Sequence, residues 1–536
     1  MTNQSLLENQ AQRPRKSEEA IAPQPQQRML KTISFVLIGV VIMLRKLQFS
    51  TGRSLWGDEA KIALNIVNRS YLDLTQVLDY NQVAPIGFLW VEKLSTQIFG
   101  ATDFALRVFP LVSAIAALFL VYHLAKRYLN PVAVPVAIAL FAFLSRQIYY
   151  SSEIKQYSSD AMIALLLVSV VYSTSTALTR RQVITFSVVG AIAVWMSHPS
   201  IFVLASIALT QIVGQIIRTM RDHKPLHLGS WFITYSIWAT SFLAFYVLSL
   251  GENSGNDTLL TSWANRRAFP ATFPDLDWMF YSLKRFFRKP LDFPEPFFNM
   301  VAIAAYIAGM VSLCKRKADG VLPLFLPIML TLAAAYLYKY PFYSRVVTFL
   351  VPFFVLMMAE GVSWLVNAKS RPGFTKTATS FVGFVFIGLL LYVPASQARA
   401  YLTPPVTDEE VKPVLAYIQE HWQPNDLIYV FQKSQFQFEF YREQFGFQPE
   451  DYVVSVDPDQ YVETNFAKVR QLYRKDLRQL CGRDRVWVMI SDFKIRPQTR
   501  FMLDHVDTLG DRRDTFQSNT PASVTYLYDL RECSGK

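Results

Sequence analysis

The chain has 536 residues, of which 52% are hydrophobic and only 18% are charged, and its formal net charge is +12. A soluble protein of this length usually carries more charge, so the composition favours an integral membrane protein. The positive charge does not indicate a nucleic-acid partner, because most basic residues lie at one end of successive apolar segments.

Residues 1–28 are polar and rich in Gln and Pro, which predicts a disordered cytoplasmic tail. Apolar runs then recur through a predicted membrane domain at residues 29–395. Each run is long enough, or nearly so, to cross about 30 Å of hydrocarbon. The sequence predicts an α-helical polytopic membrane protein with about eleven spans, near 30–49, 106–125, 131–149, 160–178, 183–197, 200–217, 230–250, 297–314, 321–338, 346–366 and 377–394.

The short connections between these spans carry their basic residues on one side of the predicted membrane. Lys and Arg are enriched in cytoplasmic loops, so this side and the N-terminus are expected to be cytoplasmic. We therefore expect a multi-pass protein of the inner (plasma) membrane. Arg45, Lys46 and Arg53 lie on the other side and are exceptions. The cytoplasmic set comprises Lys126, Arg127, Arg180, Arg181, Arg218, Arg221, Lys224, Lys315, Arg316, Lys317, Lys369 and Arg371.

The first outer loop, residues 50–105, contains an apolar segment, "PIGFLWVEKLSTQIFG", at 85–100. This segment is short for a span and includes Glu92 and Lys93. If it crossed the membrane, every later basic loop would lie outside. We therefore expect an amphipathic helix at the outer interface, within a structured loop.

After residue 395 the pattern changes to short helices alternating with apolar strands, which predicts a small extracytoplasmic α/β domain at 396–536. The expected strands are "DLIYVF", "DYVVSV", "RVWVMIS" and "SVTYLYDL", and the expected helices are "VKPVLAYIQEHW", "SQFQFEFYREQFG" and a segment around 464–480. If this domain is outside the cytoplasm, Cys481 and Cys533 can pair, and the alternative is two unrelated free thiols. The domain has no glycine-rich phosphate loop and no metal-spaced Cys/His set.

The stretch "SLWGDEAKIAL" at 54–64 places Asp58 and Glu59 together just after the first span. Consecutive helical residues point about 100° apart, so these two acids do not share one proton-transfer task. A carboxylate near a helix start is held ionised by the helix dipole, which suits Asp58 as a general base. The alternative is an acid that only stabilises the first helical turn, by about 0.3–1 kcal/mol.

A second polar stretch, "YYSSEIKQYSSD" at 149–160, lies in a short outer loop. It brings Glu153, Lys155, Tyr157 and Asp160 to the membrane edge. Polar groups at such positions often line a cavity and contact a substrate. They are equally consistent with residues that anchor an ordinary loop at the interface.

A third stretch, "YKYPFYSRVVTFLVP", places Arg345 at the outer start of a span beside Tyr340 and Tyr343. The planar guanidinium binds phosphate oxygens at two points, which suits a lipid-linked phosphate. The alternative is an arginine that extends to the interface within an aromatic belt. Arg107 in "ALRVFP" has the same two interpretations. His198 in "WMSHPS" is a further substrate-binding candidate, and the alternative is a residue that caps a tight turn.

Together these motifs resemble those of polytopic C-type (GT-C) glycosyltransferases. The most similar groups are the bacterial relatives of protein O-mannosyltransferases and the lipid A aminoarabinose transferases. The resemblance covers about residues 30–395. It rests on "WGDEA", on "PIGFLWVEKLSTQIFG" followed by "TDFALRVFP", and on "IKQYSSD" and "YPFYSRVVTFLVP".

The resemblance implies a glycosyltransferase that moves a hexose or pentose, with inversion, from a polyprenyl-phosphate donor to a hydroxyl group. The acceptor would be a lipid, an envelope glycan or a protein at the outer face of the membrane. By position, Asp58 corresponds to the catalytic base and Glu59 to its supporting neighbour. Arg107 corresponds to an arginine that contacts the acidic loop or the phosphate, and Arg345 to a basic residue near the donor phosphate.

No metal or other cofactor is expected, because the sequence shows no convincing acidic ligand set beyond Glu153 and Asp160. One alternative function is a transporter or flippase of lipid-linked sugars. That class needs polar residues near the bilayer midplane and broken helices in matched halves, whereas charged residues here gather at the outer edge. A second alternative is a membrane scaffold that displays the C-terminal domain, which would leave the acidic loop without a purpose.

Overall fold

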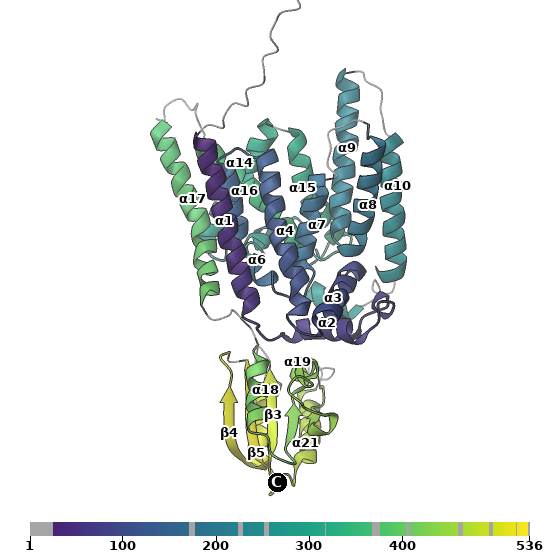
Figure 1. The fold of residues 1–536 in the computed structure, drawn as a ribbon, viewed down its shortest axis with the longest axis vertical. Coiled ribbons are helices and arrows are strands. Elements are labelled where there is room, and N and C mark those ends of the chain that lie inside the picture. The colour runs from purple at the N-terminus through teal and green to yellow at the C-terminus, as the bar shows by residue number, and fades with distance from the viewer. Residues whose placement is uncertain are drawn as a thin grey trace, which may run out of the picture.

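The computed structural model describes residues 25–170, 177–222, 229–250, 257–316, 318–366, 376–403, 407, 409–458, 465–491, 497–520 and 522–533. They form a bundle of long helices with a smaller α/β domain at one end (Figure 1). The predicted fold class is therefore confirmed.

Each of the eleven predicted spans contains a helix. These are α1 Pro25–Ser50, α4 Ala105–Tyr128, α5 Ala133–Phe143, α7 Tyr157–Val170, α8 Arg180–Met196, α9 Ser200–Asp222, α10 Gly229–Phe245, α14 Pro296–Arg316, α15 Ala318–Tyr336, α16 Val351–Val366 and α17 Lys376–Ala398. Among the described residues, six helical segments are long and apolar enough to cross a membrane: Ala105–Tyr128, Ser200–Arg221, Gly229–Ser249, Pro296–Arg316, Ser344–Trp364 and Gly383–Leu402.

Two boundaries differ from the prediction. Most of the predicted tail, residues 1–24, lies outside the described residues, but Pro25–Arg28 already belong to α1. The predicted span 131–149 is two helices, because the backbone of Leu144 (φ −59°, ψ 115°) is not helical between α5 and α6 Ser145–Tyr150. Ser145 and Arg146, at the start of α6, both contact Asp292 in the segment before α14. The break therefore turns polar residues toward that segment.

The centre of the bundle is the segment Ser344–Trp364, in which 94% of the apolar 18-residue window is buried. Its helix α16 crosses α14 at Gly309 and Gly361. A Cβ atom on Gly309 would lie 1.7 Å from the carbonyl oxygen of Met357, so only glycine permits this close approach. Nearby, Glu360 accepts hydrogen bonds from Ser312 and pairs with Arg316 at 3.1 Å. These contacts fix the two helices against each other at the end opposite the α/β domain.

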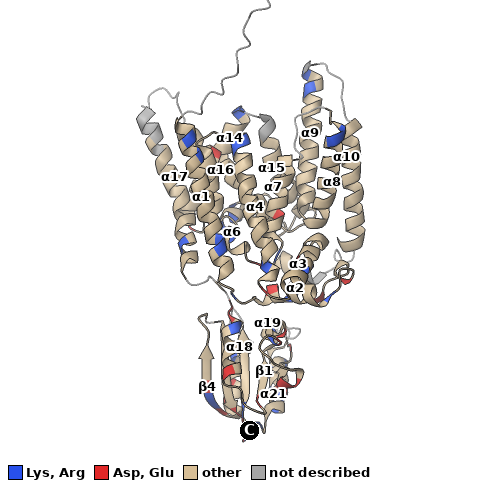
Figure 2. Cartoon of the chain, viewed as in Figure 1, with Lys and Arg blue, Asp and Glu red and all other residues tan. Residues whose placement is uncertain are grey.

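The two ends of the bundle differ in charge. Lys and Arg gather at the ends of α9 and α14 that lie away from the C-terminal domain (Figure 2). Of the basic residues predicted to share one face, Lys224, Lys317, Lys369 and Arg371 lie outside the described residues. The other basic end residues, such as Arg127 and Arg316, close the last turns of α4 and α14.

The end of the bundle nearest the C-terminal domain carries α2 and α3, which belong to the loop predicted to be outer (Figure 1). Residues 85–100 form helix α3 Ile86–Phe99, where Trp90, Leu94 and Ile98 make one exposed apolar stripe. This stripe fits the predicted interfacial position. The other segments here are α2 Gly57–Asn68, the short helices η2 Asp73–Thr75 and η3 Asp79–Asn81, α12 Asp257–Asn265, α13 Leu276–Arg288 and η5 Ser344–Leu350.

The C-terminal domain is a five-stranded sheet of order β2-β1-β3-β5-β4. β1 pairs in parallel with β2 and β3, whereas β5 is antiparallel to β3 and β4. The strands are β1 Leu427–Val430, β2 Tyr452–Val454, β3 Val486–Ser491, β4 Asp511–Gln517 and β5 Ser523–Asp529, and the helices are α18 Val411–Glu420, α19 Gln435–Tyr441, α21 Phe466–Leu477 and α22 Pro497–Leu509. The sequence predicted all of these except α22 and the exposed, charged edge strand β4.

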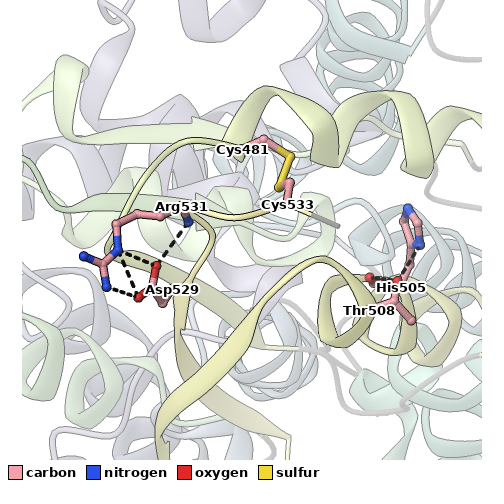
Figure 3. Close-up of a disulfide and its surroundings, with 6 residues drawn as sticks. All are labelled: Cys481, His505, Thr508, Asp529, Arg531 and Cys533. Carbon is pink, nitrogen blue, oxygen red and sulfur yellow. Dashed lines mark hydrogen bonds and ion pairs between the residues drawn. A yellow bond between two sulfur atoms is a disulfide. The ribbon is translucent and has the colours of Figure 1, made fainter. Parts of the chain in front are cut away.

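Cys481 and Cys533 form a disulfide, which decides between the two alternatives left open by the sequence. Figure 3 shows the bridge joining the segment before β3 to the residues that follow β5, beside the ion pair of Arg531 with Asp529. The bridge closes a loop with a sequence separation of 52 residues. It therefore ties the last described residues to the sheet.

Candidate active site

The acidic pair lies in the first turn of α2. Trp56 precedes the helix, and its backbone N–H donates to Glu59 at 3.4 Å. Asp58 and Glu59 both lie where the free amide groups and the helix dipole stabilise negative charge. Although adjacent in sequence, the two carboxylates point toward different partners.

Glu59 belongs to a buried group of side chains, here called the Glu59 cluster: Glu59, Arg53 and Arg107. Arg53 donates two hydrogen bonds to Glu59, at 2.6 and 2.9 Å, and the backbone N–H of Ile154 donates a third at 2.8 Å. Arg107 donates to the carbonyl oxygen of Arg53 at 2.8 Å. The cluster thus joins α2, α4 and the loop after α6.

Asp58 belongs to a second group, the Asp58 cluster: Asp58, Arg345, Lys155 and Gln82. Arg345 donates to Asp58 at 2.8 Å, the ammonium of Lys155 lies 3.4 Å from it, and Gln82 donates at 3.2 Å. Burial alone would raise the pKa of Asp58, but the charges of Lys155 and Arg345 outweigh it and hold the pKa below the ordinary carboxyl value. Asp58 is therefore ionised.

A cavity of about 270 Å³ opens beside the Asp58 cluster. Arg345 forms part of its wall, and so does Ser344, whose φ of 41° is an uncommon backbone conformation for a residue other than glycine. Asp58 contacts the cavity wall through Arg345. The lining residues are Trp56, Arg146, Tyr149, Tyr150, Glu153, Trp263, Arg266, Tyr343, Ser344 and Arg345. The cavity is thus mainly aromatic and cationic.

The arginines of the cavity are held by different contacts. The Arg345 guanidinium lies 5.3 Å from the Trp56 ring centre and 6.0 Å from that of Tyr157. Arg146 lies 3.5 Å from Asp292. The Arg266 guanidinium lies 5.6 Å from the ring of Trp263. Arginine on aromatic faces keeps its donors available for an anion.

Two other predicted residues lie at the cavity. Glu153 is almost fully buried and accepts a hydrogen bond from the Trp56 indole at 3.3 Å. Burial, then the charge of Glu59, raises the pKa of Glu153 above the ordinary carboxyl value. Tyr343 also lines the cavity, and the Arg285 guanidinium lies 3.7 Å from its ring centre.

Of the predicted site residues only Glu153, Tyr343 and Arg345 line the cavity, and Asp160, Tyr340 and His198 have other partners. Asp160 accepts a hydrogen bond from Ser197 at 2.7 Å, and the Tyr340 hydroxyl donates to the carbonyl oxygen of Val346 at 2.7 Å. His198 packs against Phe245, and burial lowers the pKa of His198 to about 4. Glu59 and Arg107 are likewise absent from the lining. The structure thus gathers Asp58, Glu153, Lys155, Tyr157, Tyr343 and Arg345 at one place.

Sequence reasoning did not name seven residues of the cavity wall as site residues: Trp56, Arg146, Tyr149, Tyr150, Trp263, Arg266 and Ser344. A signal existed in the basic residues on the face that Lys and Arg usually avoid. Arg45 and Arg53, noted as exceptions, are both buried: Arg45 donates to the carbonyl of Ala114, and Arg53 pairs with Glu59. Two of the three exceptions to the charge rule therefore have structural roles, whereas the third, Lys46, is exposed.

The C-terminal domain holds the segment that leads into Asp58. Glu410 accepts from the backbone N–H and hydroxyl of Ser54, at 3.1 and 2.9 Å, and Glu409 accepts from the N–H of Gly57 at 3.0 Å. Tyr441 accepts from the N–H of Leu55 at 3.0 Å. One apolar core also includes residues of α2, α3, α18 and α19. Residues 54–57 are thus fixed between the two domains.

Among the described residues, no three His, Cys, Asp or Glu side chains converge as a metal site. The cations beside Asp58 are side chains of the protein itself, Arg345 and Lys155. They can neutralise an anion bound in the cavity.

Comparison with known proteins gives a consistent result. A family model described as dolichyl-phosphate-mannose-protein mannosyltransferase matches residues 83–248. The structure is similar to ArnT from Cupriavidus metallidurans bound to undecaprenyl phosphate, with a TM-score of 0.51 and 11% identity over 92% of this chain and 97% of that one. ArnT in the apo state gives a TM-score of 0.49 and 10% identity over 94% and 99% of the two chains. No curated protein sequence matches.

The similarity to undecaprenyl-phosphate-bound ArnT spans both the helical bundle and the C-terminal domain, because it covers 92% of the chain. The resemblance to GT-C proteins that the sequence motifs indicated is confirmed at the level of the fold. The chain is a multi-pass membrane protein with this fold.

Proposed function

We propose that this protein is a membrane glycosyltransferase that transfers a sugar from a polyprenyl-phosphate donor to a hydroxyl acceptor. The observation that carries the proposal is the ion pair of Asp58 and Arg345, 2.8 Å apart, at the wall of an aromatic and cationic cavity. The family model described as a mannosyltransferase and the ArnT-like fold support the same reaction class.

The donor phosphate is proposed to bind Arg345, with Arg146 and Arg266 on the surrounding wall. Guanidinium groups bind phosphate oxygens at two points and remain charged at every relevant pH. The aromatic side chains Trp56 and Trp263 offer apolar surface to the sugar and the first part of the lipid. The undecaprenyl phosphate bound to ArnT supports a polyprenyl carrier.

In the proposed reaction the acceptor oxygen attacks the anomeric carbon from the face opposite the phosphate. The new carbon–oxygen bond forms while the bond to the phosphate breaks, and the phosphate leaves with the electron pair. The configuration at the anomeric carbon is inverted. The hydroxyl proton passes to Asp58, which acts as general base. Lys155, 3.4 Å from Asp58, limits the negative charge around this carboxylate.

Donor binding is proposed to activate Asp58. Without donor, Arg345 and Lys155 lower the pKa of this carboxyl and make it a weak base. A bound phosphate competes for the Arg345 donors and adds negative charge nearby, which raises the proton affinity of Asp58. The base thus becomes effective only when the donor is in place.

The proposed site faces away from the cytoplasm. Basic residues gather at the opposite end of the bundle, which favours a cytoplasmic location for that end and for the N-terminus. The Cys481–Cys533 disulfide favours an oxidising compartment for the C-terminal domain. We propose a bacterial inner membrane, with an acceptor that is a lipid, an envelope glycan or a protein.

The test is a transfer assay with the full-length protein in lipid nanodiscs. A panel of labelled polyprenyl-phosphate hexoses and pentoses is combined with envelope lipid, glycan and protein acceptors. We expect the wild type to transfer label and Asp58→Asn to be slower by about 10²–10⁴-fold, the range for loss of a general base. Glu443→Gln, which removes the same charge at an exposed position, is the control.

Two results would contradict the proposal. One is a folded Asp58→Asn variant that transfers sugar at the wild-type rate. The other is a wild-type protein that, reconstituted in vesicles, moves lipid-linked sugars across the bilayer without transferring them. The second result would favour the transporter alternative.

A further inference from the structure

Among the described residues, Glu153 is the one acidic residue in the wall of the cavity. It comes from the loop between α6 and α7, and only 1% of it is exposed. Its Oε1 atom accepts from the Trp56 indole, whereas its buried Oε2 atom has no hydrogen-bond partner among the described residues. Buried polar atoms rarely lack a partner, so this oxygen points to a missing ligand group.

The charges around Glu153 do not amount to a dedicated salt bridge. Glu59 disfavours its ionised form, and Arg345, Arg53 and Lys155 favour it. Arg53 is already paired with Glu59, while Arg345 and Lys155 are both paired with Asp58. Together with burial, this leaves Glu153 the least stabilised carboxylate of the site. The other titratable groups of the wall are Arg146, Arg266, Tyr149, Tyr150 and Tyr343.

We propose that Glu153 binds the donor in its neutral form and donates a hydrogen bond from Oε2 to an oxygen of the donor phosphate. The inference rests on the proposed function, because it names the ligand of the same cavity. An ionised carboxylate would repel the phosphate that the arginines attract, whereas a neutral acid adds a donor. Hydrogen bonds from a neutral O–H to an anionic oxygen are among the short, strong ones.

The proposal gives the site two carboxylates with opposite protonation. Asp58, which has three nearby donors, stays ionised and takes the acceptor proton. Glu153, which has one donor, holds its proton and contacts the leaving phosphate. Environments that separate two carboxylates in this way are how one site provides both an acid and a base.

A dependence of donor affinity on pH follows. A bound phosphate raises the pKa of Glu153 further, since like charges disfavour ionisation. Affinity is therefore full below the pKa of Glu153 in the free protein. It falls as pH rises above that value, by up to about tenfold per pH unit. A carboxyl whose pKa stayed near the ordinary value of about 4.3 in both the free and the bound protein would show no such fall around neutral pH.

The experiment measures the dissociation constant of a short-chain polyprenyl phosphate for the full-length protein between about pH 5.5 and pH 9, which spans documented values for buried carboxyls. The variants are Glu153→Gln, which keeps a hydrogen-bond donor without an ionisable proton, Glu153→Ala, and Glu443→Gln as the control. The ligand phosphate itself titrates near pH 6, so the informative quantity is the ratio of wild-type to Glu153→Gln affinity at each pH.

We expect wild-type affinity to fall at least about tenfold relative to Glu153→Gln across this range, with Glu443→Gln following the wild type. Glu153→Ala should bind more weakly than Glu153→Gln throughout, and the phosphate-free polyprenol should bind without pH dependence. Parallel curves for the wild type and Glu153→Gln would overturn the inference but leave the proposed function standing. A wild type that binds no polyprenyl phosphate at any pH would overturn both.

Discussion

The Glu59 cluster and the Asp58 cluster are built around acids that are neighbours in the chain. The two clusters differ in their exposure to solvent. In the Glu59 cluster, the side chains of Arg53 and Glu59 are 2% and 0% exposed. In the Asp58 cluster, the side chains of Arg345 and Asp58 are 29% and 22% exposed. The first group joins three segments of the protein, whereas the second borders the cavity.

This difference in burial assigns the two acids different roles. A buried ion pair gains little net free energy, but removing one partner leaves an uncompensated charge in a dry environment. A partly exposed pair is screened by water, so exchanging one partner is easier. Glu59 is therefore suited to hold the loop in place, and Asp58 is suited to yield Arg345 to a substrate.

The largest effect is expected when the buried ion pair of the Glu59 cluster is broken. Arg53→Ala leaves Glu59 buried without its bidentate partner and should destabilise the protein by about 3–5 kcal/mol. The measurement is the midpoint of thermal unfolding of the purified protein. The double variant Arg53→Met with Glu59→Met, which removes both charges, should recover part of the loss. If the unfolding midpoint of Arg53→Ala were unchanged, the Glu59 cluster and the Asp58 cluster could not be assigned different roles.

Changes in the partly exposed Asp58 cluster should alter the affinity for polyprenyl phosphate and leave the stability of the protein unchanged. Arg345→Ala removes a charged donor to the phosphate and should weaken polyprenyl-phosphate binding by about 10–100-fold, which corresponds to about 1.5–3 kcal/mol. Arg345→Lys should give an intermediate loss, because an ammonium is a point charge without the planar fork. The dissociation constant measures both, with the exposed Arg483→Ala as control. Unchanged affinity in Arg345→Ala would exclude Arg345 as the phosphate ligand.

The smallest effect is expected when the contact of Glu410 with Ser54, which joins the two domains, is removed. Glu410→Ala removes the acceptor for the N–H and hydroxyl of Ser54, four residues before Asp58. We expect the turnover number to fall about 3–10-fold, from roughly 1 kcal/mol of lost positioning, and restoration by the conservative Glu410→Gln. Steady-state transfer kinetics provide the test. A changed KM with an unchanged turnover number would argue against a positioning role.

The sequence predicted those parts of the molecule that local patterns encode. Long apolar runs predicted helices for all eleven spans, and short alternating runs predicted four strands of the sheet. β4 was missed because "DRRDTFQ" is polar, as suits an exposed edge strand. The break at Leu144 was missed although the polar residues Ser145, Arg146 and Gln147 follow it directly.

The site could be predicted only in part, because local patterns identify single residues and not their partners. The motifs identified Asp58 and Arg345 separately, but no local pattern shows that residues 287 positions apart form an ion pair. Nor could the motifs show which acid is buried: Glu59 and Arg107 share a closed group with Arg53. Arg146 and Arg266 reach the cavity only because the split span and the later outer loop bring them there.

The central claim is that Arg345 exchanges Asp58 for the donor phosphate. The most direct test is the affinity of the folded Asp58→Asn variant for polyprenyl phosphate. Removing the competing carboxylate frees Arg345 and removes a like charge, so we predict binding tighter by about 3–10-fold, in keeping with the modest energy of a partly exposed pair. Affinity equal to or weaker than that of the wild type would contradict the account.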